Sequence, residues 1–273
     1  MKIAFQGEIG AFSEVAALEH FGADHQTLPC ESFDAVFEAV ESGAAERGLV
    51  PVENSLAGSV HRNFDLLLQF PLVVIGEHYL RVSHCLIGLP GASVAGLKKV
   101  ISHPQALAQC EKYLRGLRGV RLEPVYDTAG SVKMVKEGGD TSVAAIAARR
   151  AADLYGMAVL AEHVEDSPAN FTRFQAISKE PVDPGQDAKT SIVFAMQNAP
   201  GALFRAMSVF ALREIDLTKI ESRPLVGKLW EYFFYIDFVG AVGDQKVKNA
   251  LANLEEYCTF LRVLGSYPRS GMR

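Results

Sequence analysis

The stretch SFDAVFEAVESGAAERGLVPVENS, Ser32 to Ser55, contains the pattern that decides the fold of the first part of the chain. Its first half has the apolar i, i+3, i+4, i+7 spacing of one helix face. The residues with this spacing are Phe33, Val36, Phe37 and Val40. Ser32 is a typical N-cap and Gly43 a typical stop. The following GLVPVENS is typical of a buried strand that runs into a polar loop. The sequence therefore predicts a helix followed by a buried strand.

The same alternation extends on both sides of this unit. The opening KIAF, residues 2–5, predicts a strand, and EVAALEHF, residues 14–21, predicts a helix that Ser13 could cap. After Pro90, strands and helices resume, and PQALAQCEKYLRGL, residues 104–117, predicts a single helix. Alternation of this kind favours parallel α/β layers.

The α/β part is expected to end near residue 180 and to form two lobes with a cleft between them. We expect residues 1–78 and 161–180 in one lobe and residues 79–160 in the other. Folds of this class bind small molecules in clefts at the carboxyl ends of their strands. The expected fold class is α/β, with a two-lobed, periplasmic-binding-protein-like domain over residues 1–180.

The C-terminal part has a different order of elements. Residues 181–189 combine prolines, a glycine and charges, which predicts a linker. Residues 190–273 then read as strand, helix, strand, strand, helix, strand, and the long aromatic strand is WEYFFYIDFVG, residues 230–240. This order predicts a ferredoxin-like βαββαβ sandwich.

Composition excludes several classes of function. The net charge of −5 gives no general attraction for nucleic acid or an anionic membrane surface. The 4 cysteines form no CxxC pair, and no histidine lies at metal-ligand spacing, so we expect no metal site and reduced thiols. No window reaches the apolar length of a membrane helix, and the start does not read as a signal peptide. We expect a cytoplasmic protein without nucleic-acid or membrane partners.

Two polar motifs follow strand-like runs. In VPVENSLAGS, residues 50–59, the polar residues follow a buried strand, and they suit either a simple turn or a ligand site. They are Glu53, Asn54 and Ser55. In SHPQALAQC, residues 102–110, Ser102 or His103 could simply cap the helix. Alternatively, the helix N-terminus could receive a carboxylate, with Ser102 and Gln109 adding hydrogen bonds.

Two further motifs point to a polar site. QGEIGAFS, residues 6–13, has a Gly-x-x-Gly turn in which Gly10 and Ser13 could let backbone N–H groups face the cleft. It lacks the remaining residues of a dinucleotide site or a P-loop.

NFTRF, residues 170–174, places Thr172 and Arg173 between aromatic residues. Arg173 suits bidentate binding of a carboxylate, but a structural pair with Glu53 or Asp166 is equally compatible with the sequence. In a regular strand Thr172 and Arg173 point to opposite faces.

Taken together, the separate motifs resemble prephenate dehydratase over the full length of the chain. They are GEIGAFS, VPVENSLAGS, SHPQALAQC, DTAGS (residues 127–131) and NFTRF. In the C-terminal part, PGAL, residues 200–203, and ESRP, residues 221–224, resemble the ACT regulatory domain fused to that enzyme. The resemblance implies conversion of prephenate into phenylpyruvate, water and carbon dioxide for phenylalanine synthesis, without a cofactor or a metal.

The resemblance also implies roles for individual residues. Thr172 would stabilise and orient the departing oxygen, and Glu53 or a water would supply the proton. Asn54, Ser102 and Gln109 would bind or orient the substrate. An apolar wall near Phe174 would destabilise the ring carboxylate relative to carbon dioxide. Further expected substrate-binding residues are Arg173, Ser55, His103, Gly10 and Ser13.

The ACT resemblance implies feedback by phenylalanine at an interface between two such domains. Backbone near Asn198, Gly201 and Leu203 would meet the amino and carboxylate groups, with Ala202 adjacent. The neighbouring strand would shape the site with Glu221, Ser222, Arg223 and Pro224. Pairing through ACT domains implies a homo-oligomer, a dimer or a tetramer.

Two alternatives stay open. Arogenate dehydratase performs the same chemistry on a substrate with an amino group in place of the keto group, and ENSLAGSVHRNFDLLL, residues 53–68, resembles plant-type enzymes of that kind. A non-catalytic amino-acid sensor would also have two lobes and a cleft. A sensor has no use for the hydroxyl of Thr172 beside Arg173, so an enzyme is the favoured interpretation.

Overall fold

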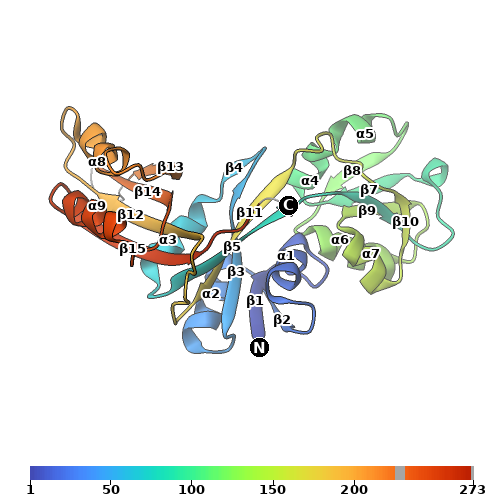
Figure 1. Cartoon of the computed structure of the whole chain (residues 1–273). Helices are drawn as coiled ribbons and strands as arrows, with labels where there is room; N and C mark the ends of the chain where they lie inside the picture. The colour runs from blue at the N-terminus through green and yellow to red at the C-terminus, as the bar shows by residue number, and fades with distance from the viewer. Residues whose placement is uncertain (225–230, 272–273) are drawn as a thin grey trace. The chain divides into compact units, whose positions relative to one another are not determined.

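The computed structural model describes residues 1–224 and 231–271 (Figure 1). Its described residues form two compact units. The first comprises Met1–Leu66 and His78–Phe174, and the second comprises Leu67–Glu77 and the chain from Gln175 onward. Trp230, with which the long aromatic strand was expected to begin, lies outside the described residues.

The first sheet begins with strands that follow the predicted alternation, in the order β2-β1-β3-β11-β5 with β4 paired to β3. Its strands are β1 Lys2–Gln6, β2 Gln26–Cys30, β3 Arg47–Asn54, β4 Gly58–Ser59, β5 Val73–Arg81 and β11 Phe171–Ser178. β1 is parallel to both β2 and β3. Helices α1 Phe12–Phe21 and α2 Phe33–Ser42 pack on these strands, and α3 His61–Gln69 follows β4. The carboxyl ends of β1 and β3 therefore lie at one edge of the sheet.

The second sheet has the order β10-β6-β9-β7-β8 and has an apolar core on each face. Its strands are β6 Cys85–Gly88, β7 Lys99–Ser102, β8 Arg121–Pro124, β9 Val143–Ala147 and β10 Ala158–Ala161. Alternate residues serve opposite faces: Ile87 packs with α6 and α7, whereas Leu86 packs with α4 and α5 (Figure 1). The helices are α4 Pro104–Gln109, α5 Glu111–Arg115, α6 Thr128–Gly138 and α7 Arg149–Tyr155, with a 3-10 turn at Val94–Gly96. Two covered sheets confirm the predicted two-lobed α/β fold.

Helix ends agree with the sequence at one helix and differ at two. Ser32 caps α2, accepting a hydrogen bond from Ala35 N–H at 3.1 Å, and Gly43 ends it in the left-handed conformation. At α1 the expected cap is wrong, because the N-cap is Ala11 and Ser13 lies inside the first turn. The single helix expected over 104–117 is also wrong, because Cys110 has φ −116° and ψ 21° and divides it into α4 and α5.

The C-terminal unit contains the predicted βαββαβ arrangement. Four antiparallel strands have the order β13-β14-β12-β15, and α8 and α9 pack on their apolar core. The elements are β12 Ala188–Ala195, α8 Ala202–Ala211, β13 Leu217–Pro224, β14 Tyr232–Val239, α9 Gln245–Glu255 and β15 Phe260–Pro268. The ferredoxin-like prediction is confirmed.

A buried ion pair lies inside this unit. Lys189 Nζ donates to both carboxylate oxygens of Glu77, at 2.7 and 2.8 Å, and Ser270 N–H adds a third bond at 3.2 Å. Glu77 therefore ties the segment Leu67–Glu77 to β12 within one compact unit.

Among the described residues, no helix combines the length and the apolar character that crossing a membrane requires.

Candidate active site

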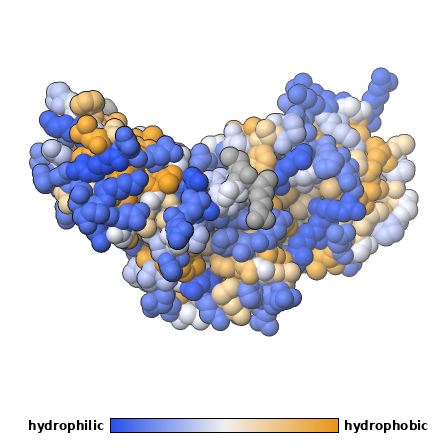
Figure 2. All heavy atoms as spheres, viewed as in Figure 1, coloured by the Kyte–Doolittle hydropathy of each residue, from blue (hydrophilic) through white to orange (hydrophobic). Residues whose placement is uncertain are grey.

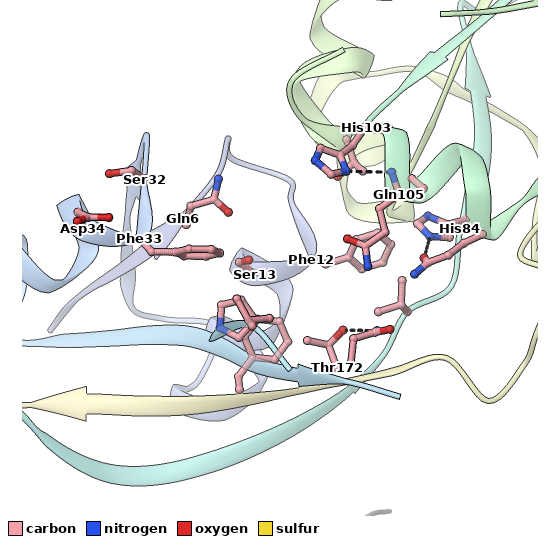
Figure 3. Close-up of a pocket in the computed structure, with 18 residues that line it drawn as sticks. Gln6, Phe12, Ser13, Ser32, Phe33, Asp34, His84, His103, Gln105 and Thr172 are labelled. Carbon is pink, nitrogen blue, oxygen red and sulfur yellow. Dashed lines mark hydrogen bonds between the residues drawn. The ribbon is translucent and has the colours of Figure 1, made fainter. Parts of the chain in front are cut away.

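A cavity of about 570 Å³ lies in the first unit, within the size range of small-molecule sites. It is lined by residues that follow strands of both sheets and by the starts of several helices. They are Gln6, Phe12, Ser13, Ser32, Phe33, Asp34, Pro51, Asn54, Val60, Val82, His84, His103, Gln105, Ala106, Gln109, Thr128, Thr172 and Phe174. Figure 3 shows Ser13, Phe12 and Thr172 around the same space.

The NFTRF motif contributes alternate residues to this cavity. Thr172 and Phe174 line it, whereas Arg173 is not among the lining residues and is 5% exposed. The reason is the period of two in β11, which sends successive side chains to opposite faces. Arg173 therefore has the opposite orientation to Thr172, the possibility that the sequence left open.

The hydroxyl of Thr172 is held by an amide. Asn54 Nδ2 donates to Thr172 Oγ1 at 3.0 Å (Figure 3). It also donates to Asn170 Oδ1 at 2.8 Å. Because the amide nitrogen can only donate, Thr172 Oγ1 accepts this bond and keeps its own proton for another partner. Thr172 is thus arranged as a hydrogen-bond donor toward the cavity.

Three helices of ten or more residues begin at the cavity. Phe12 and Ser13 open α1, Phe33 and Asp34 open α2, and Thr128 opens α6. Ser32 caps α2 and Asp127 caps α6, but the Ala11 side chain cannot cap α1. The first-turn N–H groups of α1 are therefore a suitable partner for an anion.

Charged side chains are few around this cavity. Within the part of the chain that the structure describes, Asp34 is the single acidic residue in the lining, which includes neither lysine nor arginine. Arg62 Nε donates to Asp34 Oδ2 at 3.2 Å, and this hydrogen bond lowers the pKa of the carboxyl. Behind the wall, burial raises the pKa of Asp127 despite the bonds from Gly130 and Ala129 N–H. Helix dipoles, rather than cationic side chains, provide positive potential here.

Several expected site residues line the cavity and others lie behind it. Thr172, Asn54, Gln109, Phe174, His103 and Ser13 are lining residues. Glu53, Ser55, Ser102, Gly10 and Arg173 are not.

The residues behind the wall have structural contacts. Ser102 is wholly buried, and its hydroxyl donates to Ile146 O at 2.6 Å. Ser55 Oγ donates to Ala169 O at 2.7 Å and accepts from Phe171 N–H at 2.9 Å. These serines hold the walls in place, which is a different position from the substrate contact that we expected.

Sequence reasoning missed His84 as a site residue. It lies between β5 and β6, is 2% exposed, and its ring meets Phe12 edge-on with the ring centroids 5.2 Å apart. Its Nε2 is 3.0 Å from Gln109 Oε1 (Figure 3). A single histidine in a long β-rich passage has no local signal, because its partner Gln109 is 25 residues away.

A smaller cavity lies in the C-terminal unit. It has a volume of about 190 Å³ and is lined by Met196, Gln197, Asn198, Ala199, Gly201, Ala202, Leu203, Phe204, Tyr232 and Phe234. Asn198, Gly201, Ala202 and Leu203 were expected at the effector site, whereas Glu221, Ser222, Arg223 and Pro224 are in β13 and do not line it.

Comparisons with known proteins agree with this architecture. The family described as Prephenate dehydratase matches residues 3–182, and the ACT domain family matches residues 190–256. The chain is 47% identical to arogenate dehydratase/prephenate dehydratase 2, chloroplastic, of Arabidopsis thaliana, over 98% of this chain and 73% of that protein.

Two solved structures cover nearly the whole chain. One is prephenate dehydratase from Arthrobacter aurescens in complex with L-Phe, with a TM-score of 0.90, 33% identity, and coverage of 98% of this chain and 90% of that one. The other, described as GqqA, a novel type of quorum quenching acylases, has a TM-score of 0.91, 36% identity, and coverage of 99% and 98%. The two family matches and the relative of 47% identity show that the chain belongs to the prephenate dehydratase family and has an ACT domain.

Proposed function

We propose that the protein is a prephenate dehydratase of phenylalanine synthesis that phenylalanine regulates through the ACT domain. The observation that carries the proposal is the Thr172 hydroxyl, which is held by Asn54 and faces a cavity of substrate size in a chain of this family. The reaction breaks two bonds in a substrate with two carboxylates.

In the proposed reaction the bond from the ring to its carboxylate breaks and releases carbon dioxide. The electron pair moves through the ring, which becomes aromatic, and the ring C–O bond breaks at the opposite carbon. The oxygen leaves as hydroxide and takes up a proton to form water. Thr172 O–H donates to this oxygen as negative charge develops on it, the stage at which a fixed donor is most effective.

The carboxylates need partners in a wall without cationic side chains. The first-turn N–H groups at Phe12 and Ser13 support binding of one carboxylate at the N-terminus of α1. Phe174, which is 2% exposed, is part of an apolar wall that suits conversion of a carboxylate into neutral carbon dioxide. Because Glu53 does not line the cavity, we assign the proton for hydroxide to water.

Regulation belongs to the C-terminal unit in this proposal. The cavity at the start of α8 would receive phenylalanine, and apolar residues at the surface of this unit would meet a second copy (Figure 2). The exposed residues include Leu203, Phe204, Leu212 and Ile220. Of the two expected oligomers we propose the tetramer, and light scattering of the purified chain would distinguish it from a dimer or a monomer. The proposed cytoplasmic location would be checked by fractionating cells of the source.

The decisive experiment offers purified protein prephenate and arogenate separately, with and without phenylalanine. We expect phenylpyruvate from prephenate, in equal amount with carbon dioxide, and slower formation when phenylalanine is added. Phenylalanine from arogenate with no product from prephenate would replace the proposed substrate. Product from neither would contradict the dehydratase assignment.

A further inference from the structure

A series of hydrogen bonds fixes the orientation of three amide side chains near Thr172, those of Asn54, Asn170 and Gln109. Asn54 Oδ1 accepts from the backbone N–H groups of Leu56 at 3.0 Å and Ala57 at 2.9 Å. Because backbone N–H groups only donate, this end of the Asn54 amide is the oxygen. Its nitrogen then donates to Asn170 Oδ1 at 2.8 Å, which fixes the Asn170 amide in turn.

The same logic continues to the histidine. Asn170 Nδ2 donates to Gln109 Oε1 at 3.0 Å, so this atom of Gln109 is an oxygen. His84 Nε2 lies 3.0 Å from the same oxygen and must carry a hydrogen to bond it. The backbone thus determines, through three amides, which tautomer the buried ring adopts.

The other ring nitrogen supports a neutral His84. Nδ1 is buried, and within the described residues it has no hydrogen-bond partner. A charged ring would bury an unpaired N–H there, which is costly. Burial also lowers the pKa of His84, although the hydrogen bond that the ring donates to Gln109 and the charge of Glu165 act the other way.

These hydrogen bonds determine which end of the Gln109 amide can act in the cavity. Its oxygen accepts two bonds, one from His84 and one from Asn170. The amide nitrogen is therefore the end of this lining residue that can act in the cavity, and it can only donate. Without the two bonds the amide could rotate by 180° and present an acceptor to an anionic substrate.

We propose that His84 is a positioning residue of the dehydratase site, whose neutral Nε2–H ring, together with Asn170, turns the Gln109 amide so that it donates to the substrate. This inference rests on the proposed function. His84 touches neither the reacting carbon nor the departing oxygen in this assignment and acts through Gln109.

The position of His84 suits this task because its backbone is held on both sides. His84 N–H donates to Glu165 Oε2 at 2.9 Å, and His84 O accepts from Val164 N–H at 3.0 Å. Both partners are in the connection that returns toward β11. The ring is held by its own backbone and by its T-shaped contact with Phe12, so a fixed donor is available at little entropic cost.

The first test compares two substitutions of the histidine in the full chain. His84→Leu removes the donor, and we expect kcat on prephenate to fall about 10-fold, the loss of one oriented hydrogen bond. His84→Gln places an amide nitrogen near the position of Nε2 and should restore kcat to within about 3-fold of wild type. The matched control His25→Leu, in the turn before β2, should leave kcat unchanged. Equal losses in His84→Leu and His84→Gln would overturn the proposal.

A double variant separates positioning from a structural role. If His84 acts through Gln109, adding His84→Leu to Gln109→Leu should lower kcat by less than about 2-fold. Losses that multiply would show that His84 acts independently of Gln109 and would overturn the proposal.

The tautomer can be measured without turnover. In protein with ¹⁵N-labelled histidine, the ring correlations that disappear in His84→Gln identify His84. We expect a neutral ring with hydrogen on Nε2 at pH 7, and a mixture of tautomers in Asn170→Ala. Hydrogen on Nδ1 or a charged ring in the wild type would overturn the proposal, even where His84→Leu does not fold. If the wild type converts neither prephenate nor arogenate, the proposed function fails, while this spectrum still decides the orientation.

Discussion

At the scale of the residue, strand alternation divides the NFTRF motif between two environments. Thr172 and Phe174 reach the cavity, whereas Arg173 is buried on the other face of β11. In sequence the motif reads as one polar site. In the structure, one face of the strand presents the Thr172 donor and the apolar ring of Phe174, and the other face presents the buried cation of Arg173. The residues of the motif that reach the cavity are thus alternate ones along the strand.

Removing the Thr172 hydroxyl should affect turnover more than folding. We expect Thr172→Ala to lower kcat about 100-fold, since loss of one donor to a developing oxyanion costs this much. Thr172→Ser should keep most of the activity. Thr141→Ala, in an exposed loop, is the matched control. Steady-state kinetics on prephenate measure the effect, and kcat within 3-fold of wild type for Thr172→Ala would contradict the assignment.

His20 should make stability depend on pH. Burial, with a smaller effect of His78, lowers its pKa to about 4. Below pH ~6.5 the imidazole of His20 is protonated in the unfolded chain but stays neutral in the folded protein. The free energy of unfolding should therefore fall as the pH is lowered from ~6.5 to 4. The loss is at most about 3 kcal/mol and smaller because the ring is partly exposed. Urea unfolding at pH 7 and 4.5 should show that the free energy of unfolding falls less in His20→Gln than in the wild type. Equal decreases in the two proteins would contradict the expectation.

At the scale of the element, local chemistry predicted some helix ends and tertiary packing decided others. Helix α2 begins after Ser32 and ends before Gly43, as the sequence predicts, because each of these residues forms its hydrogen bond with the same helix. The start of α1 could not be predicted in this way. There Glu14 accepts from Gly10 N–H at 2.8 Å and from Arg150 Nε at 2.7 Å, and Arg150 is 136 residues away.

The N-cap of α2 offers a test at this scale. Ser32→Ala should lower the free energy of unfolding by about 1 kcal/mol, because one first-turn N–H loses its partner. Ser42→Ala, at the other end of the same helix, should change it by less than 0.5 kcal/mol in urea unfolding. Ser32→Asp should retain the cap, and a loss in Ser32→Asp equal to that in Ser32→Ala would argue against capping as the cause.

The site itself was predictable only where motifs are continuous in sequence. The motifs of Thr172, Asn54 and Gln109 predict that these residues line the cavity, as they do. The hydroxyl of Ser102 instead donates to Ile146 O, 44 residues away, and His84 belongs to no motif. The direction of a side chain at a strand end depends on which strand lies beside it. Which strand lies beside it depends on the tertiary fold, and the local spacing of residues in the sequence does not reveal it.

At the scale of the whole molecule, the chain divides its tasks between two compact units. The second unit includes Leu67–Glu77 as well as the C-terminal sandwich, joined by the buried pair of Glu77 and Lys189. The strand order of this sandwich was predictable, since βαββαβ has one common arrangement. Its union with a segment from the middle of the α/β part involves long-range contacts such as this pair, whose two residues are 112 positions apart in sequence.

Phenylalanine should stabilise the full chain, and a glycine at the cavity should control the effect. A ligand present at 100 times its Kd adds about 2.7 kcal/mol to the free energy of unfolding. Gly201 has φ +75° at the cavity and Gly185 has φ +66° between β11 and β12, and an added Cβ meets open space at both. We expect Gly201→Ala to lose the rise in Tm with phenylalanine and Gly185→Ala to keep it. A full rise in Gly201→Ala would contradict an effector site at this cavity.

The fixed amides behind Thr172 also restrict how the family can change over evolution. Asn54, Asn170, Gln109 and His84 form an ordered series in which each orientation depends on the one before. A mutation that reverses one member leaves its neighbour facing the wrong atom, so we expect single replacements to be selected against unless a second one follows. Substitutions at these positions should therefore accumulate in pairs along a lineage, and ancestral intermediates with one change should be the slow enzymes.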